Sequence, residues 1–164
     1  MIGVNYFSKY LQFAYTWTVN DMLAVSKAKP GEFVISPRFK TSMNGLSYVW
    51  QIELYPNGYS EQEKGFISIF LILLEGPRTQ IRGNYELSLI NRYYEESKVE
   101  ESAENDFKKD KGLGHSKYLK LNLEAMATDG VMINDTLIIQ YKINLNEQGF
   151  KSPDDFSMMG PAQG

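Results

Sequence analysis

The residue types that most often carry catalysis are scarce in this chain. It contains no cysteine and one histidine, His115, so thiolate nucleophiles, disulfides, iron–sulfur clusters and cysteine-ligated zinc are excluded within it. A Ser-His-Asp triad would have to use His115, which lies in the sequence Lys-Gly-Leu-Gly-His-Ser-Lys, and no Gly-x-Ser-x-Gly motif is present. We interpret His115 as a residue of a glycine-containing surface loop rather than as a catalytic base.

Acidic residues offer a second kind of chemistry. Six carboxylates lie between Glu95 and Asp106 with only Lys98 among them, and three lysines follow at once. Paired carboxylates can hydrolyse glycosides, but the composition of this segment predicts that they are exposed, without the burial that would raise a pKa. We interpret this segment as a solvated connection. The spacings of a calcium loop and of a phosphate-binding loop are also missing, so we predict no catalytic residue, no metal site and no cofactor.

Charge and hydropathy exclude further classes of partner. The net charge of −3 gives no electrostatic reason to expect nucleic acid or an anionic membrane. The longest apolar run, 66–74, has about half the length of a membrane-spanning helix. The first residues lack the basic and apolar regions of a signal peptide. With no cysteine as well, the sequence predicts an intracellular protein of the nucleus or cytoplasm.

Hydrophobic side chains alternate along the chain with a period of two, which is typical of β-strands. In the segment 46–54 the apolar residues include Trp50, and the segment ends at Pro56-Asn57-Gly58, a turn signal. Further strands are expected at 11–19, 33–35, 66–74, 81–89 and 137–145. The run 66–74 is apolar on both faces, which predicts a strand covered on both sides. The chain is therefore expected to be an all-β, antiparallel sandwich.

Helices and flanking segments are expected to be minor. Residues 24–29 are too few for a stable helix, and Asn122 is a candidate cap for a single turn that reaches Ala127. From Gly149 onward glycine and proline recur without an apolar period, as in a flexible tail. We therefore divide the chain into an N-terminal extension (1–11), one domain (12–146) and a flexible C-terminal tail (147–164).

Several segments resemble the MATH (meprin and TRAF homology) family. The most specific is Trp-x-Ile-x-Leu-Tyr-Pro-Asn-Gly at 50–58, and Phe-Ala-Tyr-Thr-Trp-Thr-Val-Asn-Asp at 13–21 resembles the first family strand. Matches of the same order and spacing occur at 67–71, 85–91 and 134–137. The speckle-type POZ adaptors are similar in segment 13–21, in Gly-Pro-Arg-Thr-Gln-Ile-Arg-Gly-Asn-Tyr-Glu-Leu-Ser-Leu-Ile-Asn at 76–91, and in the Glu-rich segment that follows. This resemblance implies an eight-stranded antiparallel β-sandwich of the TRAF/MATH type.

The resemblance also implies a function. The chain would be a non-catalytic module that recognises short linear peptides of substrate proteins. It would recruit substrates for a cullin-3-type ubiquitin ligase when it is linked to a BTB domain, which this sequence does not contain. The alternative is a scaffold domain like the TRAF proteins, which trimerise through a coiled coil. Only about ten residues precede the first expected strand, too few for two heptads, so we expect a monomer.

Transferred by position, the resemblance implies a peptide groove formed by seven residues: Phe70, Tyr85, Asn105, Lys111, Leu113, His115 and Ser116. In the speckle-type adaptors all of these positions except those of Lys111 and Ser116 are aromatic. Asn105, Leu113 and His115 depart from that pattern, so we expect a shallower and more polar groove with different or weaker ligands. Three interpretations of His115 remain open: an exposed loop residue, a wall of the groove, or a pH-sensitive contact in that wall.

Overall fold

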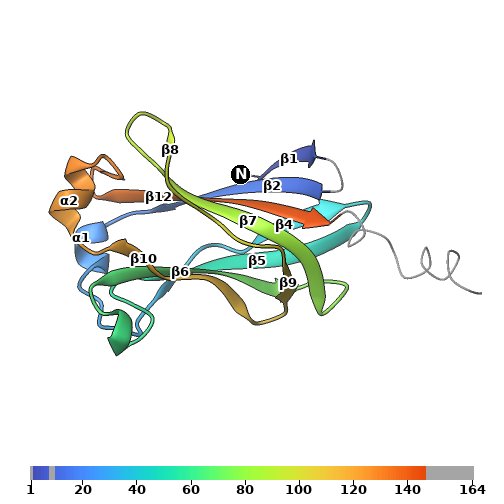
Figure 1. The fold of residues 1–164 in the computed structure, drawn as a ribbon, viewed down its shortest axis with the longest axis horizontal. Helices are drawn as coiled ribbons and strands as arrows, with labels where there is room; N and C mark the ends of the chain where they lie inside the picture. Colours follow the sequence, from blue (N-terminus) through green and yellow to red (C-terminus); the bar gives the residue numbers. More distant parts are fainter. Residues whose placement is uncertain (1, 8–9, 147–164) are drawn as a thin grey trace, which may run out of the picture.

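Two antiparallel β-sheets face each other as the layers of a sandwich (Figure 1). The structure is a computed structural model that describes residues 2–7 and 10–146. Its elements, in chain order, are β1 (Ile2–Phe7), β2 (Tyr10–Val19), α1 (Met22–Val25), β3 (Val34–Ile35), β4 (Phe39–Met43), β5 (Leu46–Tyr55), η1 (Glu61–Glu63), β6 (Phe66–Glu75), β7 (Gln80–Ile90), β8 (Glu96–Glu101), β9 (Asn105–Lys108), β10 (Gly112–Lys120), α2 (Leu123–Thr128), β11 (Met132–Ile133) and β12 (Thr136–Asn146).

The strand order fixes which strands lie at the edges. One sheet runs β1-β2-β12-β7-β8, with β11 on β12 and β9 on β7, and the other runs β10-β6-β5-β3, with β4 on β5. Every ladder between these strands is antiparallel. The predicted antiparallel sandwich is confirmed. The described residues form twelve strand segments rather than eight: β3 and β4 share the neighbour β5, β8 and β9 share β7, and the segments β1 and β11 add to β2 and β12.

The core lies between the layers and comes from the alternating faces of the long strands. Trp50 is completely buried, its ring edge meets Phe107 at 5.1 Å between centroids, and its indole Nε1 donates to Thr41 Oγ1 at 3.0 Å. Strand β12 alternates between buried and half-buried side chains over its whole length. The period of two in the sequence therefore corresponds to an inner and an outer face, as predicted.

Three segments differ from their predicted state. The acidic segment is not an irregular connection, because 96–101 and 105–108 form β8 and β9 on β7, although most of its side chains are exposed as expected. The Gly-Leu-Gly-His sequence is strand β10 rather than a loop. In β6 only one face is fully covered, since Phe70 and Ile72 on the other face are half-buried.

The helical turns lie together at one end of the sandwich (Figure 1). The Asn122 side chain accepts from the Ala125 N–H at 3.0 Å, so the predicted cap of α2 is confirmed. Residues 24–29 form no helix beyond the single turn α1, which begins at Met22 and ends at Val25, and the fully buried Met22 side chain anchors that turn to the core. No helix in the described part of the chain is long and apolar enough to cross a membrane.

The structure describes most of the expected N-terminal extension but not the expected C-terminal tail. Within 1–11, residues 2–7 form strand β1, which pairs with β2, a strand that the sequence does not suggest. The predicted tail, 147–164, lies outside the described residues.

Candidate functional site

The residues predicted to form the groove lie around strand β10, which is an edge strand. β10 pairs with β6 on one side, with Gly112 opposite Ile72 and His115 opposite Ile69, and it ends the order of its sheet. Alternate backbone N–H and C=O groups of such a strand point away from the sheet and have no ladder partner. The first half of β10 therefore offers an open edge, which we define as residues 112–116.

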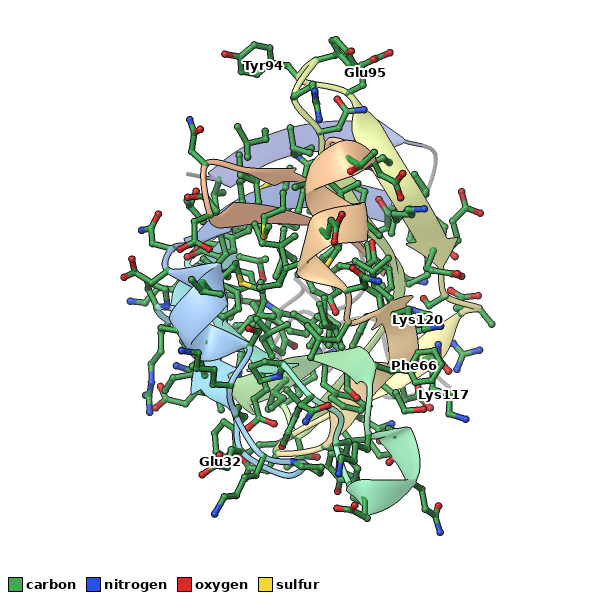
Figure 2. The ribbon with its side chains drawn as sticks, turned by 90° about the vertical axis from the view of Figure 1, so that its left-hand side faces the viewer. Glu32, Phe66, Tyr94, Glu95, Lys117 and Lys120 are labelled. Carbon is green, nitrogen blue, oxygen red and sulfur yellow. The ribbon has the colours of Figure 1, made fainter. Side chains whose placement is uncertain are left out.

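The second half of β10 is tied to the opposite sheet. The register to β6 shifts between His115 and Leu119, and the Tyr118 hydroxyl donates to the Lys98 carbonyl of β8 at 2.6 Å. Figure 2 shows Lys117 and Lys120 beside Phe66 at this part of the sheet, and Lys117 Nζ lies 5.4 Å from the Phe66 ring centroid. The regular ladder to β6 is therefore confined to the first half of the strand, where the open edge lies.

On the inner side of the open edge lie Tyr85, Leu113 and His115. Leu113 and His115 are paired with Leu71 and Ile69, whose side chains point into the core, and directly paired residues share a face. The Tyr85 hydroxyl lies 3.0 Å from His115 Nε2, and their ring centroids are 5.8 Å apart. Three of the predicted groove residues are thus brought together.

The titration of these groups follows from their burial. Tyr85 is only 4% exposed, and burial, with Glu100 nearby, raises the pKa of its hydroxyl to about 12. Burial lowers the pKa of His115, and the Glu100 carboxylate partly opposes that shift. At neutral pH a protonated tyrosine therefore faces a neutral imidazole.

On the outer side of the open edge lies Phe70. Its ring meets those of Tyr55 and Tyr59 edge-on, with centroids 5.8 and 5.4 Å away. Together these rings border a cavity of about 410 Å³, which is lined by Glu53, Tyr55, Tyr59, Phe70, Ile72, Asp110 and Gly112. The sheet formed by β6 and β10 therefore separates Phe70 from Tyr85 and His115, so the predicted residues form two half-sites, one on each face of this sheet edge.

Two glycines in β10 keep the outer half-site open. Gly112 and Gly114 alternate with Leu113 and His115, so the outer face of β10 carries no side chain at these positions. A Cβ atom at Gly114 would overlap the Ile69 carbonyl oxygen and lie 2.8 Å from Phe70 Cα. Gly114 therefore allows β10 to approach β6 closely, and it leaves the Phe70 ring uncovered.

The remaining predicted residues lie at the ends of the site. Asn105 is on β9 opposite Gly83, and its amide nitrogen donates to the Ala103 carbonyl at 2.6 Å. Lys111 is exposed in the turn before β10, where its N–H donates to the Lys108 carbonyl. The Ser116 carbonyl accepts from the buried Ser68 hydroxyl at 2.6 Å. None of these side chains has a contact that joins the two half-sites.

Sequence reasoning missed the cavity wall formed by Tyr55 and Tyr59. Both residues flank the Pro-Asn-Gly turn, where a tyrosine that follows the turn is easily interpreted as a solvent-exposed loop residue. The fold positions Tyr59 through Ser68, whose hydroxyl accepts from the Tyr59 N–H at 2.9 Å. The only signal in the sequence was the recurrence of aromatic residues on both sides of that turn.

Comparison with known proteins identifies the fold family. The family model described as "MATH domain" matches residues 14–143, so the chain belongs to the MATH domain family. The structure is similar to that of TRAF5 from Notothenia coriiceps, with a TM-score of 0.56 and 18% identity over 79% of this chain and 72% of that chain. MATH and TRAF domains are protein-interaction modules and are generally non-catalytic.

Proposed function

We propose that this domain binds short linear peptides of partner proteins as an added strand on the open edge of β10. The observation that carries the proposal is the position of two half-sites, one on each face of that edge. An extended peptide paired with an edge strand directs successive side chains to opposite faces. Side chains on one face of the peptide would meet Phe70, and those on the other face would meet Leu113 and His115.

The groove that we propose is less aromatic than that of the speckle-type adaptors. Phe70 and Tyr85 keep aromatic rings, while Asn105, Leu113 and His115 supply smaller or more polar surfaces. Aromatic residues commonly dominate the energy of peptide interfaces. Because Tyr85 is buried beneath His115, its ring supports the site from below, and the directly accessible ring is Phe70.

The segments that resemble the speckle-type adaptors support a more specific role inside the cell. When linked to a BTB domain, the module would recruit substrate proteins to a cullin-3-type ubiquitin ligase. The similarity to TRAF5 favours a second candidate, a scaffold domain without a ligase role. In sedimentation of the protein a trimer would favour the scaffold role, and we expect a monomer.

Nuclear magnetic resonance tests the peptide-binding proposal directly. The ¹⁵N-labelled domain would be titrated with Ser- and Thr-rich extended peptides. We expect the amide shifts of 112–116 to change, and the outward-pointing amides of this segment to become protected from hydrogen exchange on binding. Shifts confined to the other sheet edges, with none at β10, would contradict the proposal.

A further inference from the structure

The cavity on the outer side of β10 combines aromatic walls with acidic groups. Tyr55, Tyr59 and Phe70 supply three mutually edge-on rings, while Glu53 and Asp110 supply carboxylates. Within the part of the chain that the structure describes, no lysine or arginine lines this cavity. The combination of rings and uncompensated carboxylates is complementary to a cation.

The rings are held in place, and those of Tyr59 and Phe70 are accessible. Tyr59 is 54% exposed, so its ring can meet a ligand. The Tyr55 hydroxyl donates to Glu53 Oε1 at 3.1 Å, which orients the carboxylate while the second oxygen remains available to a donor. Burial, together with Glu53, raises the pKa of Tyr55 to about 12, so this donor keeps its proton at physiological pH.

The distance between the open edge and the cavity determines which peptide side chains are long enough to enter the cavity. Neighbouring strands lie about 4.8 Å apart, so a peptide paired with β10 has its backbone roughly two spacings, about 10 Å, from the strand that carries Phe70. A side chain from the peptide must therefore cross β10 before it meets the ring. Gly112 and Gly114 leave that path free of side chains. Among common side chains, lysine and arginine are long enough to cross and are charged at the tip.

We propose that this cavity binds the arginine or lysine side chain of an extended peptide that pairs with β10. The inference rests on the proposed peptide-binding function and specifies its ligand. The peptide carries one basic residue on the outer face, with its aliphatic stem over the glycines and its charge between Glu53, Asp110 and the aromatic rings. Lys109 and Lys111 flank Asp110 in sequence and are exposed, so peptides with several adjacent basic residues bind more weakly than peptides with one.

A set of matched peptides tests the charge preference. The background is a short peptide of alternating Thr and Ser, with a single central residue that is Arg, Lys, Gln or Glu, and affinity is measured by calorimetry. We expect the Arg peptide to bind about tenfold more tightly than the Gln peptide, as for a charge-assisted contact in a partly exposed site. The Glu peptide is expected to bind most weakly. Added salt should reduce the Arg preference.

Two isosteric variants and one control test whether the carboxylates of the cavity cause the preference for arginine. Glu53→Gln and Asp110→Asn should each reduce the ratio of Arg to Gln affinity without changing the thermal melt, because the substituted amides keep the shape of the cavity. Glu124→Gln removes an exposed carboxylate on α2, outside the cavity, and should leave the ratio unchanged. An equal reduction of the Arg-to-Gln affinity ratio in all three variants would show that the net charge of the domain, and not this cavity, causes the preference. That result would overturn the proposal.

A second probe separates this inference from the peptide-binding function itself. N-acetylarginine methylamide, followed by amide shifts of Gly112 and Tyr59, reports on the cavity without any peptide strand. Peptides that bind through β10 with equal affinity for Arg and Gln would overturn the inference and leave the proposed function intact. Shifts with the arginine derivative, but no binding of any peptide, would overturn the proposed function and retain only a cation pocket. Absence of both signals would overturn both proposals.

Discussion

The Tyr85 hydroxyl and His115 Nε2, 3.0 Å apart, join the two sheets of the sandwich at its open edge. Tyr85 belongs to β7 of one sheet and His115 to β10 of the other. Because the raised pKa of Tyr85 keeps its proton in place and the lowered pKa of His115 favours the neutral ring, the hydroxyl donates to Nε2. This assigns His115 the tautomer with a proton on Nδ1, and it makes the histidine part of the inner wall of the site.

The lowered pKa of His115 predicts that acid weakens the fold. Between the folded pKa and the unfolded value of about 6.5, the unfolded chain binds more protons than the native one. The free energy of unfolding should therefore fall as the pH decreases through this window and should be fully retained above it. His115→Gln keeps an acceptor for Tyr85 but does not titrate. Urea unfolding of both proteins from about pH 7 to about pH 5 should show a smaller decrease in the variant, and equal decreases would contradict this assignment.

Phe70→Ala and Tyr85→Ala should separate binding from stability. Phe70 is half-buried on the outer face, so its loss should cost about 2 kcal/mol or more of affinity for the Arg-containing peptide, with a small change in the melt. Tyr85 is buried among Phe107, Tyr141 and His115. Its truncation should lower the free energy of unfolding by about 3–5 kcal/mol. Calorimetric binding and a thermal melt of each variant check this split, and a strongly destabilised Phe70→Ala would argue that Phe70 belongs to the core.

Restoring aromatic residues on the inner side should increase affinity for Ser- and Thr-rich peptides. The double variant Leu113→Trp with His115→Phe supplies two rings on the face that meets Tyr85. Its melt should decrease modestly, because the Tyr85 hydroxyl loses its acceptor, at a cost of about 1 kcal/mol. The single variant His115→Phe is the control for that cost. An intact double variant with unchanged affinity would show that these positions do not contact the peptide.

The two glycines of β10 should respond differently to alanine. At Gly114 a methyl group would overlap the backbone of β6, so Gly114→Ala should cost about 2 kcal/mol or more and disturb the open edge. At Gly112 the nearest atom is Phe70 Cβ at 3.3 Å. Gly112→Ala should therefore fold with a cost below about 1 kcal/mol while narrowing the path to the outer cavity. Chemical unfolding of both variants gives the comparison, and similar costs would contradict the close approach at Gly114.

Most of the long strands could be predicted from sequence because buried side chains on one face alternate with less buried ones on the other. Trp50 and its apolar neighbours alternate with polar residues, and the turn at Pro56-Asn57-Gly58 marks where that strand ends. The cap at Asn122 was predictable for a similar reason, since the chemistry of a helix start is local. These features need no information about the rest of the fold.

The edge strands could not be predicted in the same way. Strand β8 is held by backbone hydrogen bonds to β7, and most of its side chains are exposed, so its sequence is as polar as that of a loop. Strand β10 alternates glycine with Leu113 and His115, a pattern that equally fits a glycine loop. For the candidate site, the resemblance implied one groove of seven residues, of which the structure places Tyr85, Leu113 and His115 on the inner side of β10. The sequence did not predict that Phe70 lies on the opposite face, because Phe66–Leu74 is apolar on both faces.

The open edge of β10 has a consequence for solutions of the protein at high concentration. A strand that can accept a peptide can also accept the same strand of a second copy, which is the first step of edge-to-edge aggregation. Lys117 and Lys120 of this strand and Lys111 in the turn before it are exposed, so two copies that approach edge-on bring like charges together. This repulsion is screened by salt. High ionic strength should therefore promote self-association through this edge, whereas at low ionic strength the edge stays available to peptides.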